Sequence, residues 1–520
     1  MKEEITLRKY HAHVWDEPLL MDLSCKGQRG ILVPEAEPKV KEAVGDSKSV
    51  IPASMRRKEL PELPEVAQPQ VLRHFLRLSQ MTLGVDVAND IGSGTCTMKY
   101  SPKINEKLCR MPHIAELHPF QDERTVQGIL EIIYKTRDCM KEISGMDEVS
   151  FHPSSGGQAV YTACSIVRAY HEARGEGRKR DQVITTMFSH PVNAACPAAV
   201  GYEVITIMPD KDGYPDFEAL KAAVSERTAA LFTTNPEDTG IYNARIEQFI
   251  DLVHKAGGLC FTDQANSNGI LGKARAADVG FDMCHFNLHK AFSSPHGGLG
   301  PGCGALCVKG NLAKFLPVPV VTFDGKRYRL DRDRPESIGK VRDFIGNVQV
   351  VVRAYAWIMS LGAEGLKTVA ETAVLNNNYL EKLLMAIPGV GESYGEGKVR
   401  LDQVRYHWQK LKEDTGVGSE DVELRMTDFG LVNYWLSHHP HVVPEPFTPE
   451  PTESYSKEEI DYWAAVMRQI SREAYEDPEK VKGAPYAAVV PRADMSPLMM
   501  PEKCIMTYKK YKQMKQEKGE

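Results

Sequence analysis

The feature that most constrains the fold is an alternation of short apolar runs and amphipathic stretches between about residues 149 and 308. The apolar runs have the length of buried strands, and the stretches between them repeat apolar residues at helical spacing. Such alternation predicts an α/β fold with a mainly parallel sheet and flanking helices. The predicted strands are Val149–His152, Val183–Met187, Val204–Met208, Ala229–Thr234, Leu259–Asp263, Met283–Asn287 and Ala305–Val308, and the predicted helices include Gln158–Ala173, Phe217–Ser225 and Ile246–Ala256.

The rest of the chain is predicted to form a lead-in and a smaller C-terminal domain. A length of 520 residues predicts two or three packed units, at roughly 100–200 residues each. We predict an extended arm and helical lead-in over residues 1–120, a large cofactor-binding domain over 121–370, and an α+β domain with a basic tail over 371–520. Dense prolines exclude long helices from 31–70. Further helices are predicted from about Gln70 and at Arg124–Ile143, Ser337–Ser360 and Lys457–Tyr475.

Charge and cysteine content narrow the functional class. Lys and Arg number 64 against 70 Asp and Glu, a formal net charge of -6, which excludes a strongly basic nucleic-acid platform. No apolar run approaches the ~18 residues of a membrane-spanning helix, and the first residues lack the apolar core of a signal peptide. The 11 cysteines contain no CxxC pair. We therefore expect a cytoplasmic protein that needs no metal and has neither nucleic acid nor membrane as a partner.

A small-residue turn lies between the first predicted strand of this region and the helix that follows. In parallel sheets, ligands bind outside the carboxyl ends of the strands. Small residues let backbone N–H groups approach an anion, and a helix N-terminus favours negative charge. The alternative is an ordinary strand-to-helix turn. The candidate phosphate-binding residues are Ser154, Ser155, Gly156, Gly157 and Gln158.

Three further side chains follow other predicted strands. Asp263 closes one strand and could hold a protonated ring nitrogen, or it could simply close a loop. His289 and Lys290 follow an apolar strand and are both candidate cofactor-binding residues. Partial desolvation of Lys290 there would favour Schiff-base chemistry; a surface lysine is the alternative. His190 could stack on a cofactor ring or serve the structure alone. Pyridoxal phosphate is the one cofactor that needs a phosphate turn, a ring partner, an anion at its nitrogen and a lysine.

A set of longer segments between about Lys58 and Leu383 has a distinctive sequence. They include RRKELPELPEV, GTCTMKYSPKINE, LHPFQDERTVQGILEIIY, TNPEDTGIY, DQANSNGILGKARAADVGFDM and FNLHKAFSSPHGGLGPG. These segments resemble glycine dehydrogenase (decarboxylating) subunit 2, half of the P-protein of the glycine cleavage system, and the resemblance thins beyond Leu384. It implies a fold-type-I pyridoxal-phosphate enzyme with Lys290 as the Schiff-base lysine, His190 on the ring, Asp263 on the ring nitrogen, Ala265 beneath the ring and Asn235 near the cofactor.

The same resemblance implies a reaction and partners. Glycine would lose CO2, and its aminomethyl group would pass to the lipoyl arm of H-protein. The two-subunit form of the family pairs this chain with a homologous subunit 1, which implies a dimer or a heterotetramer. Lys290 would place the chemistry in this chain.

Some positions depart from the family pattern where substrate and lipoyl arm would enter. They are Ala88–Gly94, Ala291 after the lysine, Leu299 in the glycine run, and the C-terminal SHHPH run at Ser437–His441. One alternative is therefore a divergent lyase, decarboxylase or aminotransferase for another small amino acid or amine, with Arg342, Arg353 or Arg400 as a carboxylate clamp. A second alternative is a non-catalytic assembly subunit. A third is a metal hydrolase that uses His438, His439 and His441. The role of Cys96 stays open between packing and redox chemistry.

Overall fold

The computed structural model describes residues 5–59, 61–84, 87–295, 301–394, 397–432, 434, 436–439, 442–494, 500 and 507–519. Leu299 and His441 lie outside these ranges. The chain divides into two compact units: Met1–Arg8 with Asn89–Ala484, and Lys9–Ala88 with Pro485–Glu520. The predicted domain boundaries near residues 120 and 370 stay predictions.

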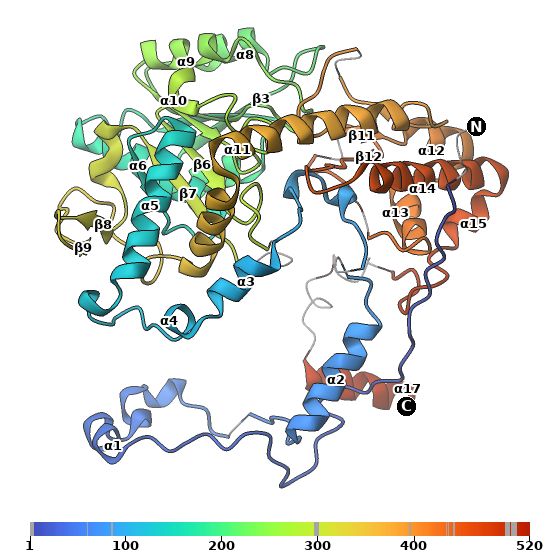
Figure 1. The fold of residues 1–520 in the computed structure, drawn as a ribbon, viewed down its shortest axis with the longest axis horizontal. Coiled ribbons are helices and arrows are strands. Elements are labelled where there is room, and N and C mark those ends of the chain that lie inside the picture. Colours follow the sequence, from blue (N-terminus) through green and yellow to red (C-terminus); the bar gives the residue numbers. More distant parts are fainter. Residues whose placement is uncertain are drawn as a thin grey trace. The chain divides into compact units, whose positions relative to one another are not determined.

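A seven-stranded sheet forms the centre of the larger unit, and all seven predicted strands are present within two residues of their predicted ends (Figure 1). The strand order is β1-β7-β6-β5-β4-β2-β3, and β3, β2, β4, β5 and β6 run parallel to one another. Strand β7 is antiparallel to both β6 and β1. The strands are β1 Glu148–Ser150, β2 Gln182–Thr186, β3 Glu203–Ile207, β4 Thr228–Thr234, β5 Leu259–Asp263, β6 Met283–Asn287 and β7 Gly304–Val308.

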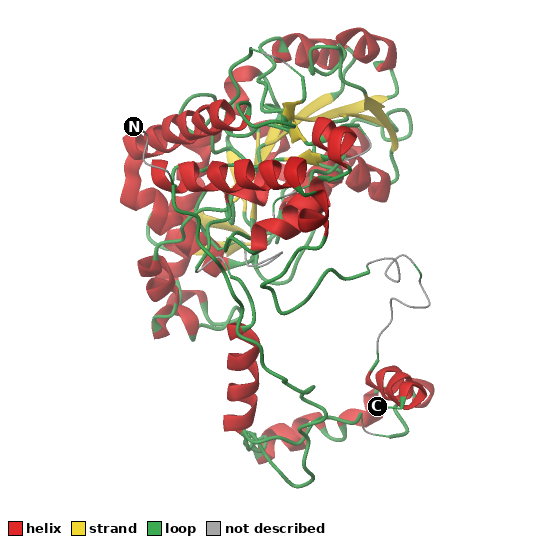
Figure 2. Ribbon diagram, turned by 90° about the vertical axis from the view of Figure 1, so that its right-hand side faces the viewer, coloured by secondary structure: helices red, strands yellow, loops and turns green. Residues whose placement is uncertain are grey.

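Both faces of this sheet are covered by helices, which Figure 2 shows on either side of the strands. Successive side chains of a strand point to opposite faces. Leu231 of β4 accordingly joins one apolar cluster, and its neighbour Phe232 joins the other. The first cluster includes residues of α5 Gln127–Ser144, α9 Ile246–Lys255 and α11 Val348–Leu384, and the second includes residues of α6 Gly156–Ala173. The remaining helices around the sheet are α7 Val192–Val200, α8 Phe217–Ala223 and α10 Ala276–Val279.

The helix predicted at Ser337–Ser360 begins eleven residues later than expected, because two glycines interrupt it. Gly339 and Gly346 both have φ of 84°, in the left-handed region that breaks a right-handed helix. A Cβ on Gly346 would also lie 2.1 Å from the Phe151 carbonyl oxygen. The helix therefore starts at Val348, as α11, and runs to Leu384 with a kink at Gly362.

Helix α11 extends from the sheet to the C-terminal part of the same unit, where it packs against α14 Lys457–Glu476 (Figure 1). The α14 helix was predicted at Lys457–Tyr475, and a capping box of Ser456 and Glu459 fixes its start. Stacked aromatic rings of Tyr406, Trp408, Tyr434 and Phe447 fill the core there. The other elements of this part are β10 Gly391–Glu392, β11 Tyr406–His407, α12 Gln409–Thr415, α13 Ser419–Thr427, β12 Pro446–Phe447 and α15 Pro478–Lys482.

The smaller unit contains α1 Pro38–Val44, α2 Gln68–Gln80 and α17 Tyr508–Lys518. Within it, the buried carboxylate of Glu17 pairs with His74 and Arg77 of α2, at 2.8 and 2.9 Å. Across the described residues, no helix is both long and apolar enough to cross a membrane. The elements that precede or flank the sheet in the larger unit are η3 Ile91–Cys96, α3 Lys103–Cys109, α4 Pro112–Ala115, η4 Glu123–Thr125, η5 Gly310–Phe315, β8 Val320–Phe323 and β9 Tyr328–Asp331.

Candidate active site

The Ser154–Gln158 turn connects β1 to the N-terminus of α6, at the sheet edge where the parallel strands end. Ser155 caps the helix, because its Oγ accepts a hydrogen bond from the Gln158 backbone N–H at 3.1 Å. Ser154 donates from its backbone N and its Oγ to Gln158 Oε1, at 2.7 and 2.9 Å. Gln158 Nε2 in turn donates to the Val341 carbonyl at 2.7 Å. The side chain of Gln158 thus holds the turn in shape, which leaves the first backbone N–H groups of α6 to receive an anion.

Gly156 is required in this turn by close packing. A Cβ there would lie 2.8 Å from Asn287 Nδ2 and 3.1 Å from His285 Nε2. Both neighbours belong to β6, and Asn287 Oδ1 and both ring nitrogens of His285 have no hydrogen-bond partner in the described part of the chain. Buried polar atoms without partners are rare in folded proteins. His285 and Asn287 therefore place unfilled hydrogen-bonding atoms beside a turn suited to phosphate.

Asp263 is buried at the end of β5, with 4% of its surface exposed. It accepts hydrogen bonds from Asn193 Nδ2 and from the backbone N–H of Ala265, both at 3.0 Å. The ring of His285 is also close: its Nε2 lies 3.5 Å from Asp263 Oδ1. Burial alone would raise the carboxyl pKa, but His285, His190 and the two hydrogen bonds outweigh it and hold the pKa below its usual value. Asp263 is therefore a buried anion near neutral pH.

His190 lies half-buried in the loop that follows β2. Its Nδ1 accepts a hydrogen bond from the Val192 backbone N–H at 3.1 Å, which fixes the ring orientation. Burial, with the nearby His438, lowers the His190 pKa to about 4. The imidazole is therefore neutral at physiological pH, and a neutral flat ring suits stacking on an aromatic cofactor.

Lys290 is buried, with 9% exposure, in the turn after β6. Its backbone N–H donates to the Asn287 carbonyl at 3.0 Å. Its ammonium is one of the charges that act on His190, on His285 and on Cys96. The structure thus brings Lys290, His190 and Asp263 together, as the order of the parallel strands predicts.

Three other predicted residues have mainly structural contacts. Asn235 exchanges two hydrogen bonds with the backbone of Asn243, at 2.8 and 3.3 Å, and so closes the loop after β4. His289 accepts from the Cys303 backbone N–H at 3.1 Å through its Nδ1. Ala265 is half-buried and contributes its backbone N–H to Asp263. Their assignment to the cofactor stays a prediction.

Sequence reasoning missed two buried carboxylates that reach the site from the C-terminal part. Glu450 accepts from Asn266 Nδ2 and from the Thr97 backbone N–H, both at 3.0 Å, and burial raises its pKa well above the usual value. Asp402 accepts from the Gly269 backbone N–H at 3.3 Å, and burial raises its pKa to about 6. The Lys290 ammonium is among the charges that oppose the shift at Glu450. Both carboxylates come from irregular segments without a motif spacing, so the sequence alone gives no signal for them.

Two of the three arginines considered as a carboxylate clamp pair with other groups, and the third is exposed. Arg353 donates twice to Glu106, at 2.9 and 2.7 Å, and Arg342 is exposed. Arg400 is fully buried and donates to backbone carbonyls, among them Thr239 at 2.6 Å. A fourth arginine, Arg405, pairs with Asp238 at 2.8 Å beneath the His438 loop.

The SHHPH run does not form a cluster of metal ligands in the part of the chain that is described. His438 Nδ1 lies 3.3 Å from Asp238 Oδ2, and His439 Nε2 lies 3.3 Å from the Ser189 carbonyl oxygen. Among the described residues, a group of three possible metal ligands is formed instead by His254, Cys260 and Asp282. His438 and His439 therefore lie on the His190 side of the site.

Comparison with known proteins first defines the class of the fold. The sequence model of the aminotransferase class-V family matches residues 155–390. A crystal structure of an inhibitor-bound glycine decarboxylase (P-protein) of the glycine cleavage system superposes with a TM-score of 0.69, covering 84% of this chain and 99% of that one at 19% identity. A NifS-like protein superposes at 0.56, over 73% and 98%, at 16% identity. The chain thus has the fold-type-I architecture of pyridoxal-phosphate-dependent enzymes.

Sequence relatives then define the family. "Probable glycine dehydrogenase (decarboxylating) subunit 2" of Pyrococcus abyssi is 44% identical over 98% of this chain and 99% of its own length. The protein of the same name from Halalkalibacterium halodurans is 43% identical over 92% and 96%. This chain belongs to the glycine dehydrogenase (decarboxylating) subunit 2 family. The glycine dehydrogenase C-terminal domain matches residues 369–485, so the resemblance continues well beyond Leu384, where it was expected to thin.

Proposed function

We propose that this chain is the decarboxylating, pyridoxal-phosphate-dependent subunit of a glycine cleavage system. The observation that carries the proposal is the meeting of a buried lysine, Lys290, and a buried anion, Asp263, at neighbouring strand ends beside the N-terminus of α6. Family membership and the class-V fold support the same cofactor.

The pocket fits this cofactor by the chemistry of its donors. The first N–H groups of α6 and the close-packed turn at Gly156 suit a phosphate. Asp263 suits a protonated ring nitrogen, and unpartnered atoms of His285 and Asn287 lie beside Gly156 in the turn. When bound, pyridoxal phosphate accepts the electron pair that an amino acid releases on losing its carboxyl group.

The side chains of this chain would divide the remaining work. Lys290 Nζ holds the cofactor and, once released, can accept or return a proton at the reacting carbon. Asp263 keeps a negative charge fixed in a dry site, where it acts more strongly than in water. Neutral His190 covers one side of the ring and excludes water. Burial raises the pKa of Glu450, which favours the protonated form of its carboxyl group, and the Lys290 ammonium opposes that shift.

The proposed reaction needs an electron acceptor, and the lipoyl disulfide of H-protein would supply it. The carboxyl C–C bond of glycine and the S–S bond break, and a C–S bond forms to the aminomethyl carbon. The remaining proton goes to the second sulfur, and CO2 leaves. The proposal includes a homologous subunit 1 as partner, in a dimer or heterotetramer, and the "subunit 2" name of the relatives supports that pairing.

We also propose a cytoplasmic location. The ten described cysteines form no disulfide with one another, as expected in a reducing compartment. Fractionation of the source cells, with the chain recovered among soluble cytoplasmic proteins, would test this location.

The function is tested by spectroscopy and isotope exchange. The purified chain, incubated with pyridoxal phosphate, should gain a visible absorption band that Lys290→Ala lacks. With its partner subunit, glycine and lipoylated H-protein, it should exchange labelled bicarbonate into the glycine carboxyl group. A bound cofactor without exchange, but with a spectral response to another amino acid, would favour the divergent lyase, decarboxylase or aminotransferase instead. A chain that binds no cofactor would indicate an assembly subunit.

A further inference from the structure

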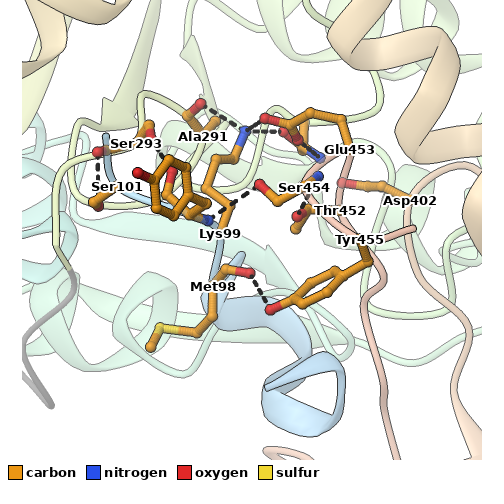
Figure 3. A network of polar contacts seen from close by, with 12 residues as sticks. Met98, Lys99, Ser101, Ala291, Ser293, Asp402, Thr452, Glu453, Ser454 and Tyr455 are labelled. Atoms are coloured by element: carbon orange, nitrogen blue, oxygen red, sulfur yellow. Dashed lines mark hydrogen bonds and ion pairs between the residues drawn. The ribbon is translucent and has the colours of Figure 1, made fainter. Parts of the chain in front are cut away.

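A buried ammonium group, that of Lys99, lies behind the Lys290 turn (Figure 3). Its side chain is only 1% exposed. Lys99 Nζ donates to Asn268 Oδ1 at 2.6 Å, to Glu453 Oε1 at 2.8 Å and to the Ala291 carbonyl at 2.9 Å. The ring of Trp357 lies 4.9 Å from the same nitrogen. All three protons of the ammonium group are therefore used.

Placing a charge in this position is unfavourable unless the contacts compensate it. Burial lowers the pKa of Lys99, and Glu453 opposes that shift. A neutral side chain would fill the same space without the desolvation penalty. The contact that distinguishes this site from a plain buried ion pair is the one with Ala291, the residue that directly follows Lys290.

The same segment holds the other end of the Lys290 turn. Ser101 Oγ donates to the Ser293 carbonyl at 2.9 Å, and Ser293 Oγ donates to the Tyr100 carbonyl at 2.6 Å. The Ser293 backbone N–H closes the turn on the Lys290 carbonyl at 3.0 Å. Ser293 has φ of 59°, a left-handed conformation that non-glycine residues adopt at some energetic cost. Contacts from residues 99–101 hold this strained turn in place.

The C-terminal part completes the arrangement from the opposite side, as Figure 3 shows. Glu453 accepts from Lys99 and, at 3.4 Å, from Asn268 Nδ2. Ser454 Oγ accepts from the Tyr100 backbone N–H at 3.1 Å. The Tyr455 hydroxyl, which donates to Asp90, also lies 3.2 Å from the Met98 carbonyl oxygen. The position of the Ala291 carbonyl is thereby linked to residues 453–455.

We propose that Lys99 is a positioning residue for Lys290: with Glu453 it fixes the carbonyl of Ala291 and so the direction in which Lys290 enters the site. This role rests on the proposed function, because it assumes that Lys290 holds the cofactor. The three hydrogen bonds of the Lys99 ammonium all go to protein groups, so the role assigned to it acts through the Ala291 carbonyl. Its loss should change how well Lys290 is aligned more than how well glycine binds.

The decisive variant is the double substitution Lys99→Met with Glu453→Gln, which removes the ammonium without leaving a buried carboxylate unpaired. Lys99→Arg keeps the charge but changes its shape. Lys314→Met is the matched control, because Lys314 also pairs with a glutamate, Glu336, at 2.7 Å and lies 5.0 Å from an aromatic ring, that of Phe315, but is exposed. All are made in the full chain and loaded with pyridoxal phosphate.

Two readouts separate positioning from folding. The first is the pH midpoint of the visible band without substrate, which the double variant should shift by about half a unit or more. The second is exchange kinetics, in which kcat should fall about tenfold or more while KM for glycine changes less than about threefold. Lys99→Arg should give a smaller loss in the same direction, and Lys314→Met should match wild type in both readouts. A double variant that binds cofactor and matches Lys314→Met in both would overturn the proposal.

The design distinguishes this inference from the proposed function. If Lys290→Ala keeps the visible band, Lys290 does not hold the cofactor and the proposed function fails. If Lys290→Ala loses the band but the Lys99 variants match the control, only the positioning role fails. If the double variant does not fold, Ser101→Ala removes an uncharged contact of the same turn. It should shift the band midpoint in the same direction as Lys99→Arg, and an unchanged midpoint would refute the role.

Discussion

The imidazole rings of His190 and His438 lie edge to face, with centroids 4.4 Å apart and planes at 65°. The first follows a central strand of the sheet and the second belongs to the C-terminal part. Behind His438, the carboxylate of Asp238 lies 3.3 Å from Nδ1 and is paired with Arg405. The C-terminal part therefore supplies one wall of the space around His190.

We predict that His438→Ala brings the His190 pKa back toward its ordinary value near 6.5. In the wild type burial, followed by His438, lowers that pKa to about 4, so His190 does not titrate between pH 5 and 8. Removing the second ring admits water and removes a like charge. NMR titration of the histidine side chains would measure the shift. His118 is exposed, so His118→Ala should leave the His190 pKa unchanged. An unshifted His190 pKa in His438→Ala would show that His438 does not shield His190 from water.

Asp263→Asn should retain the fold and reduce activity by about a hundredfold or more, because a fixed charge in a water-excluded site is removed. Asn keeps the size of the side chain but has one acceptor oxygen where Asp263 has two, so one of the two hydrogen bonds, from Asn193 to Oδ2 or from Ala265 to Oδ1, is lost with the charge. Bicarbonate exchange measures the loss, and urea unfolding checks the fold. Asp282→Asn is the matched control: Asp282 is also buried and accepts from a histidine, His254. Equal activity losses in both variants would argue against a special role for Asp263.

Gly156→Ala should weaken cofactor binding by about tenfold or more. The added methyl group would press on Asn287 and His285 and push the turn away from its present position. Equilibrium titration with pyridoxal phosphate, followed by the visible band, would measure the change. Gly128→Ala, near the start of α5, has no atom within 4 Å of the new Cβ and should bind normally. Undiminished affinity in Gly156→Ala would remove this turn from the phosphate site.

The stability of the chain should fall with rising pH in a way that Asp402 partly controls. Burial raises the Asp402 pKa to about 6 from 3.8, so the folded state holds a proton that the unfolded state has already lost. The stabilisation that this extra proton gives the folded state is fully present below pH 3.8 and is lost as the pH rises through 6. Between pH 5 and 8 the loss amounts to about 1 kcal/mol.

Urea unfolding at pH 5 and pH 8 tests this dependence. Asp402→Asn cannot lose this proton. The free energy of unfolding of the variant should therefore fall less between pH 5 and pH 8 than that of wild type, by about 1 kcal/mol. Exposed Asp333→Asn should behave like wild type. Equal pH dependence in wild type and Asp402→Asn would show that Asp402 is not protonated in the folded chain.

The sheet could be predicted closely because its strands are short apolar runs that end in polar residues. Strands β5 and β6 begin and end where expected, at Leu259–Asp263 and Met283–Asn287. The long helix was placed too early, since helical periodicity does not reveal that Gly339 and Gly346 adopt left-handed conformations. Propensity is a weak guide where tertiary contacts, such as that of Gly346 with Phe151, decide the backbone.

The site could be predicted only where its residues stand at strand ends. Lys290, Asp263 and His190 follow that rule. Glu450 and Asp402 do not follow a strand. They come from irregular segments far along the chain, and no motif spacing in the sequence indicates them. His285 was within reach: a histidine inside a wholly buried strand needs a polar reason to be there.

The contact of Lys99 with Glu453 also has a consequence for the order in which the protein is made. The ribosome synthesises Lys99, Asp263 and Lys290 long before residue 453, so a nascent chain carries these residues before the carboxylate that pairs with Lys99 exists. Until then a buried ammonium would lack its carboxylate, which disfavours closing the turn around it. Completion of the site is thus tied to the last stages of translation, and a chain truncated before residue 450 would keep the sheet residues without a finished pocket.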